Sequence, residues 1–248
     1  MSAAILIGLL LAAPVARGEA GAGDEATATS DAAVSTQAKS RPKAVSSRWM
    51  KVGEAERDRE VDQASALPLA ERLLSMSAGF LDTPYGNSPL GEGRGKDPDP
   101  MIRFDEADCL TFVEETMAMS LAASAADVSP LLQQIRYAGE PSFVERNHLM
   151  EAQWLPNNVK KGFLRDITQD LAGASVRVVN KHLTERAWTS KLAQALELPK
   201  ERQLTGDFPI TIVPRSAALE VAKRAPAGTV MIVVRDDRPR LPDRKSVV

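Results

Sequence analysis

A strongly apolar helix, with the only cysteine of the chain at its start, is the feature that most constrains this sequence. Residues 110–126 repeat large apolar side chains at the three- and four-residue spacing of a helix. Further apolar side chains occupy a second side, and a helix that is apolar on more than one side is buried. We therefore expect a fold built around this helix, with Cys109 at its first turn.

Cys109 follows Asp108, and an aspartate is a good N-cap residue because its carboxylate accepts backbone N–H groups of the first turn. The positive end of a helix dipole favours a thiolate over a thiol. The same helix start can stabilise an oxyanion that forms during attack on a carbonyl. Cys109 is therefore the best candidate nucleophile. The alternative is a buried structural cysteine beside an ordinary helix cap.

The N-terminus is typical of an exported protein. Residues 3–16 are apolar throughout, and small residues follow at Ala16, Gly18 and Ala20. This pattern predicts a signal peptide over residues 1–20 and a location in the periplasm or cell envelope. No Lys or Arg precedes the apolar run, so the start of the gene lies upstream or the amino terminus supplies the positive charge. The alternative is a buried N-terminal helix.

The remainder divides into two parts. Residues 21–66 are mostly small or charged, so we expect a disordered tether. Residues 67–248 form the expected folded domain, and no later segment is long and apolar enough to span a membrane. A net charge of −2 and only 4% aromatic residues give no reason to expect a nucleic-acid partner.

Within the domain, hydrophobic spacing predicts several shorter elements. Four Gly and three Pro among residues 86–100 predict a long surface loop. Residues 143–168 have no clean period and predict irregular structure with short strands. The unbroken apolar run 229–234 is typical of a central strand. Further helices are expected at 68–80, 130–136, 192–198 and 217–224.

A thiol nucleophile usually needs a base, and the chain has two histidines. His148 is the likelier partner because Arg and Asn residues surround it in sequence, whereas His182 is expected on a surface. The histidines lie far apart and no second cysteine exists, so no metal site and no cofactor are predicted.

The order of several short strings resembles a known family. Thr83-Pro84-Tyr85 is followed by Asp-Cys-Leu-Thr-Phe-Val-Glu at 108–114, Ile-Arg-Tyr at 135–137, Arg-Asn-His at 146–148, and Asp-Ile-Thr at 166–168. This order is similar to the N-acetylmuramoyl-L-alanine amidase-like family of the NlpC-type papain-like cysteine hydrolases. The resemblance covers roughly residues 67–248.

The resemblance implies a papain-like α+β fold in which the nucleophile helix packs on an antiparallel sheet. It implies Cys109 as the nucleophile and His148 as a catalytic residue. Tyr85 matches a tyrosine that lies beside the nucleophile and the substrate in related enzymes. We assign Tyr85, Asp108 and Arg146 to substrate binding.

The C-terminus departs from the family pattern. The resemblance implies a Ser-His-x-Gly segment after the strand that here spans residues 228–234, and no histidine follows Gly228. We therefore expect a domain that is truncated, lacks one or more C-terminal strands, and has an incomplete catalytic pair.

The expected function is exported hydrolysis of an amide in the peptide part of peptidoglycan or of muropeptides. The bond is either the lactyl amide to L-alanine or one within the stem peptide. The first alternative is a catalytically impaired cell-wall-binding remnant without its base histidine. The second is an acyltransferase or lipid-directed enzyme, which the apparent lack of an apolar patch disfavours.

Overall fold

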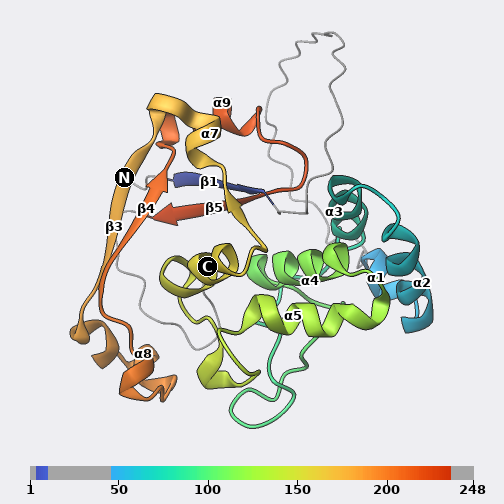
Figure 1. Ribbon diagram of the computed structural model, residues 1–248. Coiled ribbons are helices and arrows are strands. Elements are labelled where there is room, and N and C mark those ends of the chain that lie inside the picture. Colours follow the sequence, from blue (N-terminus) through green and yellow to red (C-terminus); the bar gives the residue numbers. More distant parts are fainter. Residues whose placement is uncertain (1–3, 11–45, 236–248) are drawn as a thin grey trace, which may run out of the picture.

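The computed structural model describes residues 4–10 and 46–235, and it combines a group of helices with two small antiparallel sheets (Figure 1). The helices are α1 (Arg48–Lys51), α2 (Glu54–Ala64), α3 (Leu69–Ala78), α4 (Cys109–Leu121), α5 (Val128–Arg136), α6 (Leu155–Lys160), α7 (Thr168–Ala172), α8 (Lys191–Ala195) and α9 (Arg215–Ala222). The strands are β1 (Ala4–Leu10), β2 (Arg165–Asp166), β3 (Arg177–Leu183), β4 (Gly206–Ile212) and β5 (Thr229–Arg235).

The apolar helix predicted from the sequence is α4, and it lies in the main core. Met117 and Ala118 of α4 are buried in the same cluster as Ile210 of β4 and Ile232 of β5. Helix α4 ends five residues earlier than expected, at Leu121, because a separate 3₁₀ turn follows. The predicted α+β class, with this helix packed against antiparallel strands, is confirmed.

The predicted tether is wrong for residues 46–66, because α1 and α2 are folded onto the domain. The Trp49 side chain is completely buried, and its indole nitrogen donates to the Met76 carbonyl at 2.9 Å. Val61 of α2 joins the same core cluster. One large aromatic residue in a polar segment is therefore enough to anchor it. Residues 21–45 of the predicted tether lie outside the described residues.

The larger sheet has the strand order β2-β1-β5, with both pairings antiparallel. The apolar run near the C-terminus is a strand, β5, as predicted, but among the described strands it lies at the edge of the sheet and β1 lies in the centre. Its partner β1 comes from the predicted signal peptide, where Ile7 pairs with Ile232. The rest of that predicted peptide lies outside the described residues. Residues 236–248 also lie outside them, and the expected lack of C-terminal strands stays a prediction.

The second sheet is a β3–β4 pair that the sequence analysis did not predict. Val179 pairs with Ile210, and Leu183 pairs with Gly206. Most side chains of β3 are exposed, so the strand carries little apolar signal. In Figure 1 this pair lies apart from α3, α4 and α5, with α8 near one end of it.

Residues 143–168 are mainly helical turns, which corrects the expectation of short strands. A π-helical turn over Met150–Trp154 leads into α6, and β2 supplies the only strand, two residues long. The amide of Asn158 donates to the carbonyls of Ile135 and Trp154, which ties this segment to the end of α5. None of the helices between residues 46 and 235 has the length and apolar character needed to cross a membrane.

Candidate active site

The side chain of Cys109 is exposed at the first position of α4. Asp108 precedes it in an extended conformation and accepts from the backbone N–H groups of Leu110 at 3.0 Å and Thr111 at 2.7 Å. The Thr111 hydroxyl accepts from the Asp108 N–H at 2.9 Å, which completes a capping box. The predicted helix start is therefore present, and it presents the thiol to solvent.

Asp108 also connects this helix to loop 86–100. The backbone N–H of Ser88 donates to its second carboxylate oxygen at 3.1 Å. The Asp108 side chain is thus buried and holds three backbone N–H groups. These contacts give Asp108 a role in holding the helix start, and its assignment to substrate binding stays a prediction.

Tyr85 lies beside Cys109. A parallel bridge pairs Tyr85 with Ala107, and the Gly86 N–H donates to the Ala107 carbonyl at 3.1 Å. The pKa of the Tyr85 phenol is raised by partial burial, by the nearby charges of Cys109 and Asp108, and by a hydrogen bond with the Cys109 side chain. The structure therefore brings these two predicted site residues together.

A groove of about 430 Å³ opens at Cys109. Its walls come from residues 73–77 of α3, the first turns of α4, and residues 228–231 at the start of β5. No Asp, Glu, Lys or Arg contributes to this lining. The sequence has no long apolar patch, but three elements distant in sequence together form this mostly apolar lining.

His148 has a buried side chain whose Nε2 is 2.7 Å from the Phe143 carbonyl oxygen. Its ring also packs against the Phe143 ring, with centroids 4.8 Å apart. Burial, with the charges of Arg146 and Arg136 nearby, lowers the pKa of His148 to about 4. It does not line the groove at Cys109. These contacts favour a structural role, and its assignment as the base stays a prediction.

Arg146 is also buried, and its guanidinium is bound by two carboxylates. Its Nε and Nη2 donate to Glu92 at 3.0 and 2.6 Å, and its Nη1 donates to Asp97 at 3.0 Å. The predicted substrate-binding role would require these ion pairs to open. The geometry instead assigns Arg146 to the support of loop 86–100.

The other histidine, His182, is exposed and pairs with Asp207 at 2.8 Å across the β3–β4 pair. It does not line the groove. Within residues 4–10 and 46–235, no three His, Cys, Asp or Glu side chains are grouped so that they could hold a metal ion.

Residues 75–239 match the model of the AmiA-like, N-acetylmuramoyl-L-alanine amidase-like family. The chain belongs to this family. No curated protein matches it.

Solved structures are similar at low identity. A Legionella pneumophila protein assigned to the family model DUF1460 shares 23% identity with a TM-score of 0.50, over 73% of this chain and 61% of that one. An N-acetylmuramoyl-L-alanine amidase from Bacteroides uniformis shares 23% identity with a TM-score of 0.43, over 65% and 63%. This chain thus spans about three fifths of the length of either structure. The first similarity supports the fold alone.

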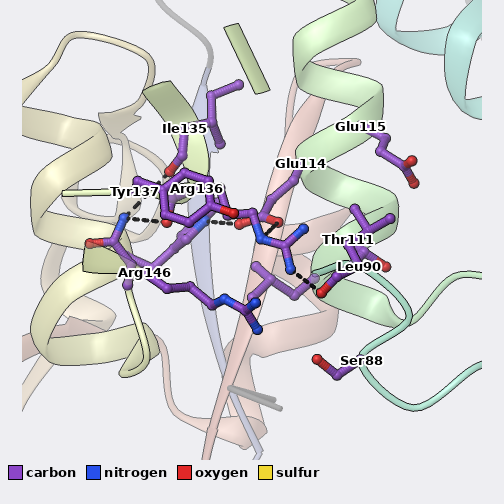
Figure 2. Close-up of polar contacts among 12 residues, drawn as sticks. Ser88, Leu90, Thr111, Glu114, Glu115, Ile135, Arg136, Tyr137 and Arg146 are labelled. Carbon is purple, nitrogen blue, oxygen red and sulfur yellow. Dashed lines mark hydrogen bonds and ion pairs between the residues drawn. The ribbon is translucent and has the colours of Figure 1, made fainter. Parts of the chain in front are cut away.

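A buried ionic cluster lies beneath the amidase-like site, and the sequence analysis missed it (Figure 2). Glu114 and Glu115 of α4 are buried, with Arg136 of α5 facing Glu114 at 4.0 Å. The Trp154 indole donates to Glu114 at 2.8 Å, and the Arg103 N–H donates to Glu115 at 2.9 Å. Two adjacent glutamates within an otherwise apolar helix were the available sequence signal.

Burial sets the protonation of this cluster. It raises the pKa of Glu114 to about 7, although the Arg136 charge and the Trp154 hydrogen bond act in the opposite direction. Burial also raises the pKa of Glu115 well above its usual range, with the Arg103 N–H bond and Arg136 opposing it. Glu114, one of the two glutamates on the helix that carries Cys109, therefore has a pKa near neutral pH.

Proposed function

We propose that this chain is an exported cysteine amidase that cleaves an amide bond in the peptide part of peptidoglycan. One observation carries the proposal: an exposed thiol stands at the capped start of α4, beside a tyrosine hydroxyl, in an open groove. Membership of an amidase-like family supports the type of reaction and the class of substrate.

The proposed mechanism has two steps. The Cys109 thiolate attacks the amide carbonyl, and the tetrahedral intermediate collapses and expels the amine, whose nitrogen takes a proton from solvent. Water then hydrolyses the thioester, which releases the carboxylic acid and the thiolate and returns that proton to solvent. The positive end of the α4 dipole stabilises both the thiolate and the oxyanion. The Tyr85 hydroxyl, which is hydrogen-bonded to the Cys109 side chain, orients the sulfur for attack.

The groove favours one of the two bonds that the sequence left open. A carboxylate transferred from water into a lining without cations loses its hydration and gains no counter-ion. Bonds within the stem peptide have carboxylates beside them, whereas the lactyl amide to L-alanine has a methyl group on either side. The uncharged lining therefore favours the lactyl amide as the scissile bond.

A second candidate is a wall-binding protein with impaired catalysis. Both histidines of the chain lie outside the groove lining, and His148 has a depressed pKa. A general base typically contributes about 10²–10⁴-fold to rate. A helix terminus alone does not supply that factor, so weak turnover with retained binding would identify this candidate.

The test is mass spectrometry of purified muropeptides incubated with the chain and with Cys109→Ala. Cleavage of the lactyl amide that disappears in Cys109→Ala is the expected result. Cleavage that survives the substitution would overturn cysteine catalysis. Retention on insoluble peptidoglycan without products would favour the binding protein, and an acyl group moved onto an added amine would identify acyl transfer.

Export is tested separately. Expression with the native N-terminus in a bacterial host should give an envelope-located product whose mass lacks residues 1–20. An unprocessed product in the cytoplasm would contradict export and would agree with β1 being a permanent strand of the sheet.

A further inference from the structure

We infer that Arg136 is a positioning residue for Cys109, because it joins the nucleophile helix to the loop that carries the rest of the site. The inference rests on the proposed role of Cys109 as the nucleophile. Arg136 ends α5 and is not among the residues that line the groove.

The Arg136 guanidinium reaches in two directions from a buried position. Its Nη2 donates to the Leu90 carbonyl in loop 86–100, and its Nε lies 4.0 Å from the Glu114 carboxylate on α4. Figure 2 shows the guanidinium between these two partners. One side chain of α5 therefore connects the loop with the helix.

The far part of loop 86–100 is held by two residues that follow Arg136 in the chain, Tyr137 and Arg146. Arg146 bridges Glu92 and Asp97 across the loop, and the Tyr137 hydroxyl donates to Glu92 at 2.9 Å. These contacts fix Glu92 and Asp97, and Arg136 adds the contact at Leu90, between them and Ser88.

The near part of the loop holds the site itself. The Ser88 N–H binds Asp108, and Tyr85 is paired with Ala107 immediately before that cap. The path from Arg136 to Cys109 thus runs through Leu90, Ser88 and Asp108. One hydrogen bond joins Arg136 to Leu90, and another joins Ser88 to Asp108. Loosening the first contact frees the cap and the tyrosine together.

The chemistry of Arg136 points to positioning rather than packing. Its Nε and Nη1 are buried without a hydrogen-bond partner among the described residues. A guanidinium keeps its charge in proteins, so this burial is costly, and an apolar side chain of similar length would fill the space without that cost. The planar fork is suited to two partners at fixed angles, which a lysine ammonium does not reproduce.

The experiment measures alkylation of Cys109 by iodoacetamide from pH 5 to pH 10. Cys109 is the only cysteine, so the reaction reports one site and needs no substrate. Arg136→Lys keeps the charge and removes the fork. We expect alkylation at pH 7 to slow by about fivefold, the size of a lost helix cap. The matched control is Arg165→Lys, at an exposed pair with Asp170, and its profile should equal that of the wild type.

Replacing Arg136 with an uncharged residue would leave the buried Glu114 carboxylate without its cation, so a second variant changes both residues. The pair Arg136→Met with Glu114→Gln removes both charges and keeps an oxygen for the Trp154 indole. It should fold by circular dichroism and should also alkylate slowly. A wild-type profile in either folded variant would overturn the inference. Loss of folding in both would also overturn it, since Arg136 would then hold the core rather than the site.

The inference and the proposed function fail differently. If Cys109→Ala leaves muropeptide cleavage intact, the proposed function fails whatever the alkylation data show. If cleavage depends on Cys109 while both Arg136 variants alkylate and cleave like the wild type, only the positioning role is wrong.

Discussion

The hydroxyl of Tyr85 is hydrogen-bonded to the side chain of Cys109 from a segment that precedes helix α4. Tyr85→Phe removes this hydroxyl and keeps the ring. Because a hydrogen bond to a charged group contributes about 1.5–3 kcal/mol, we expect kcat/KM for muropeptide cleavage to fall by about tenfold or more. Stability should change by less than about 0.5 kcal/mol, since the side chain is 71% exposed. Unchanged kcat/KM would show that the hydroxyl has no part in the reaction.

Asp108 holds the start of α4 and loop 86–100 at once. Asp108→Ala leaves the N–H groups of Ser88, Leu110 and Thr111 without their acceptor. We expect a loss of about 2 kcal/mol in the free energy of unfolding, measured in urea, and slower alkylation of Cys109. The matched variant is Asp108→Asn, which keeps one acceptor oxygen and should lose about half as much. Equal losses in the two variants would argue against the cap as the cause.

The free energy of unfolding should depend on pH through Glu114. Its pKa is about 7 in the folded chain and about 4.5 in the unfolded chain. The folded state then binds more protons between these values, so the contribution of Glu114 to stability falls as pH rises from about 4.5 to 7. Glu114→Gln removes this loss and should gain stability relative to the wild type over that range, by about 3 kcal/mol at most.

His148 should change the free energy of unfolding with pH in the opposite direction, so it provides a control for the same experiment. Its pKa of about 4 means that the unfolded chain binds more protons between pH 4 and 6.5, so stability falls as pH falls through this range. The two slopes oppose each other in the wild type. Glu114→Gln should therefore reveal a steeper acid loss, and a difference between the two proteins that is independent of pH would contradict the buried carboxylate.

Gly228 lies in the turn immediately before β5, the strand that forms one wall of the groove. It has a φ of +85°, and an added Cβ would lie 2.7 Å from the Leu73 side chain. Gly228→Ala should lower the free energy of unfolding by about 1–3 kcal/mol. Gly93→Ala is the control, because Gly93 has a φ of +67° but open space around the Cβ position. The difference between the two variants isolates the contact with Leu73, and equal losses would show that backbone strain alone is responsible.

Local sequence was sufficient for the elements that depend on neighbouring residues. The cap at Asp108, the helix that starts at Cys109 and the strand 229–234 were predicted because caps and apolar runs are properties of short segments. The exposed strand β3 was missed because most of its side chains point to solvent, which leaves no apolar alternation to detect. The prediction of a tether is wrong at Trp49, because its buried indole holds this polar segment against the core.

By itself, the sequence determined the family, the helix start, and Cys109 as the residue most suited to attack. Only the tertiary structure decided which predicted partners surround that thiol. It placed Tyr85 beside Cys109, and it buried Arg146 and His148 in contacts with Glu92 and Phe143. The reason is that capping depends on residues a few positions apart, whereas the burial of a charge depends on counter-ions that distant segments supply.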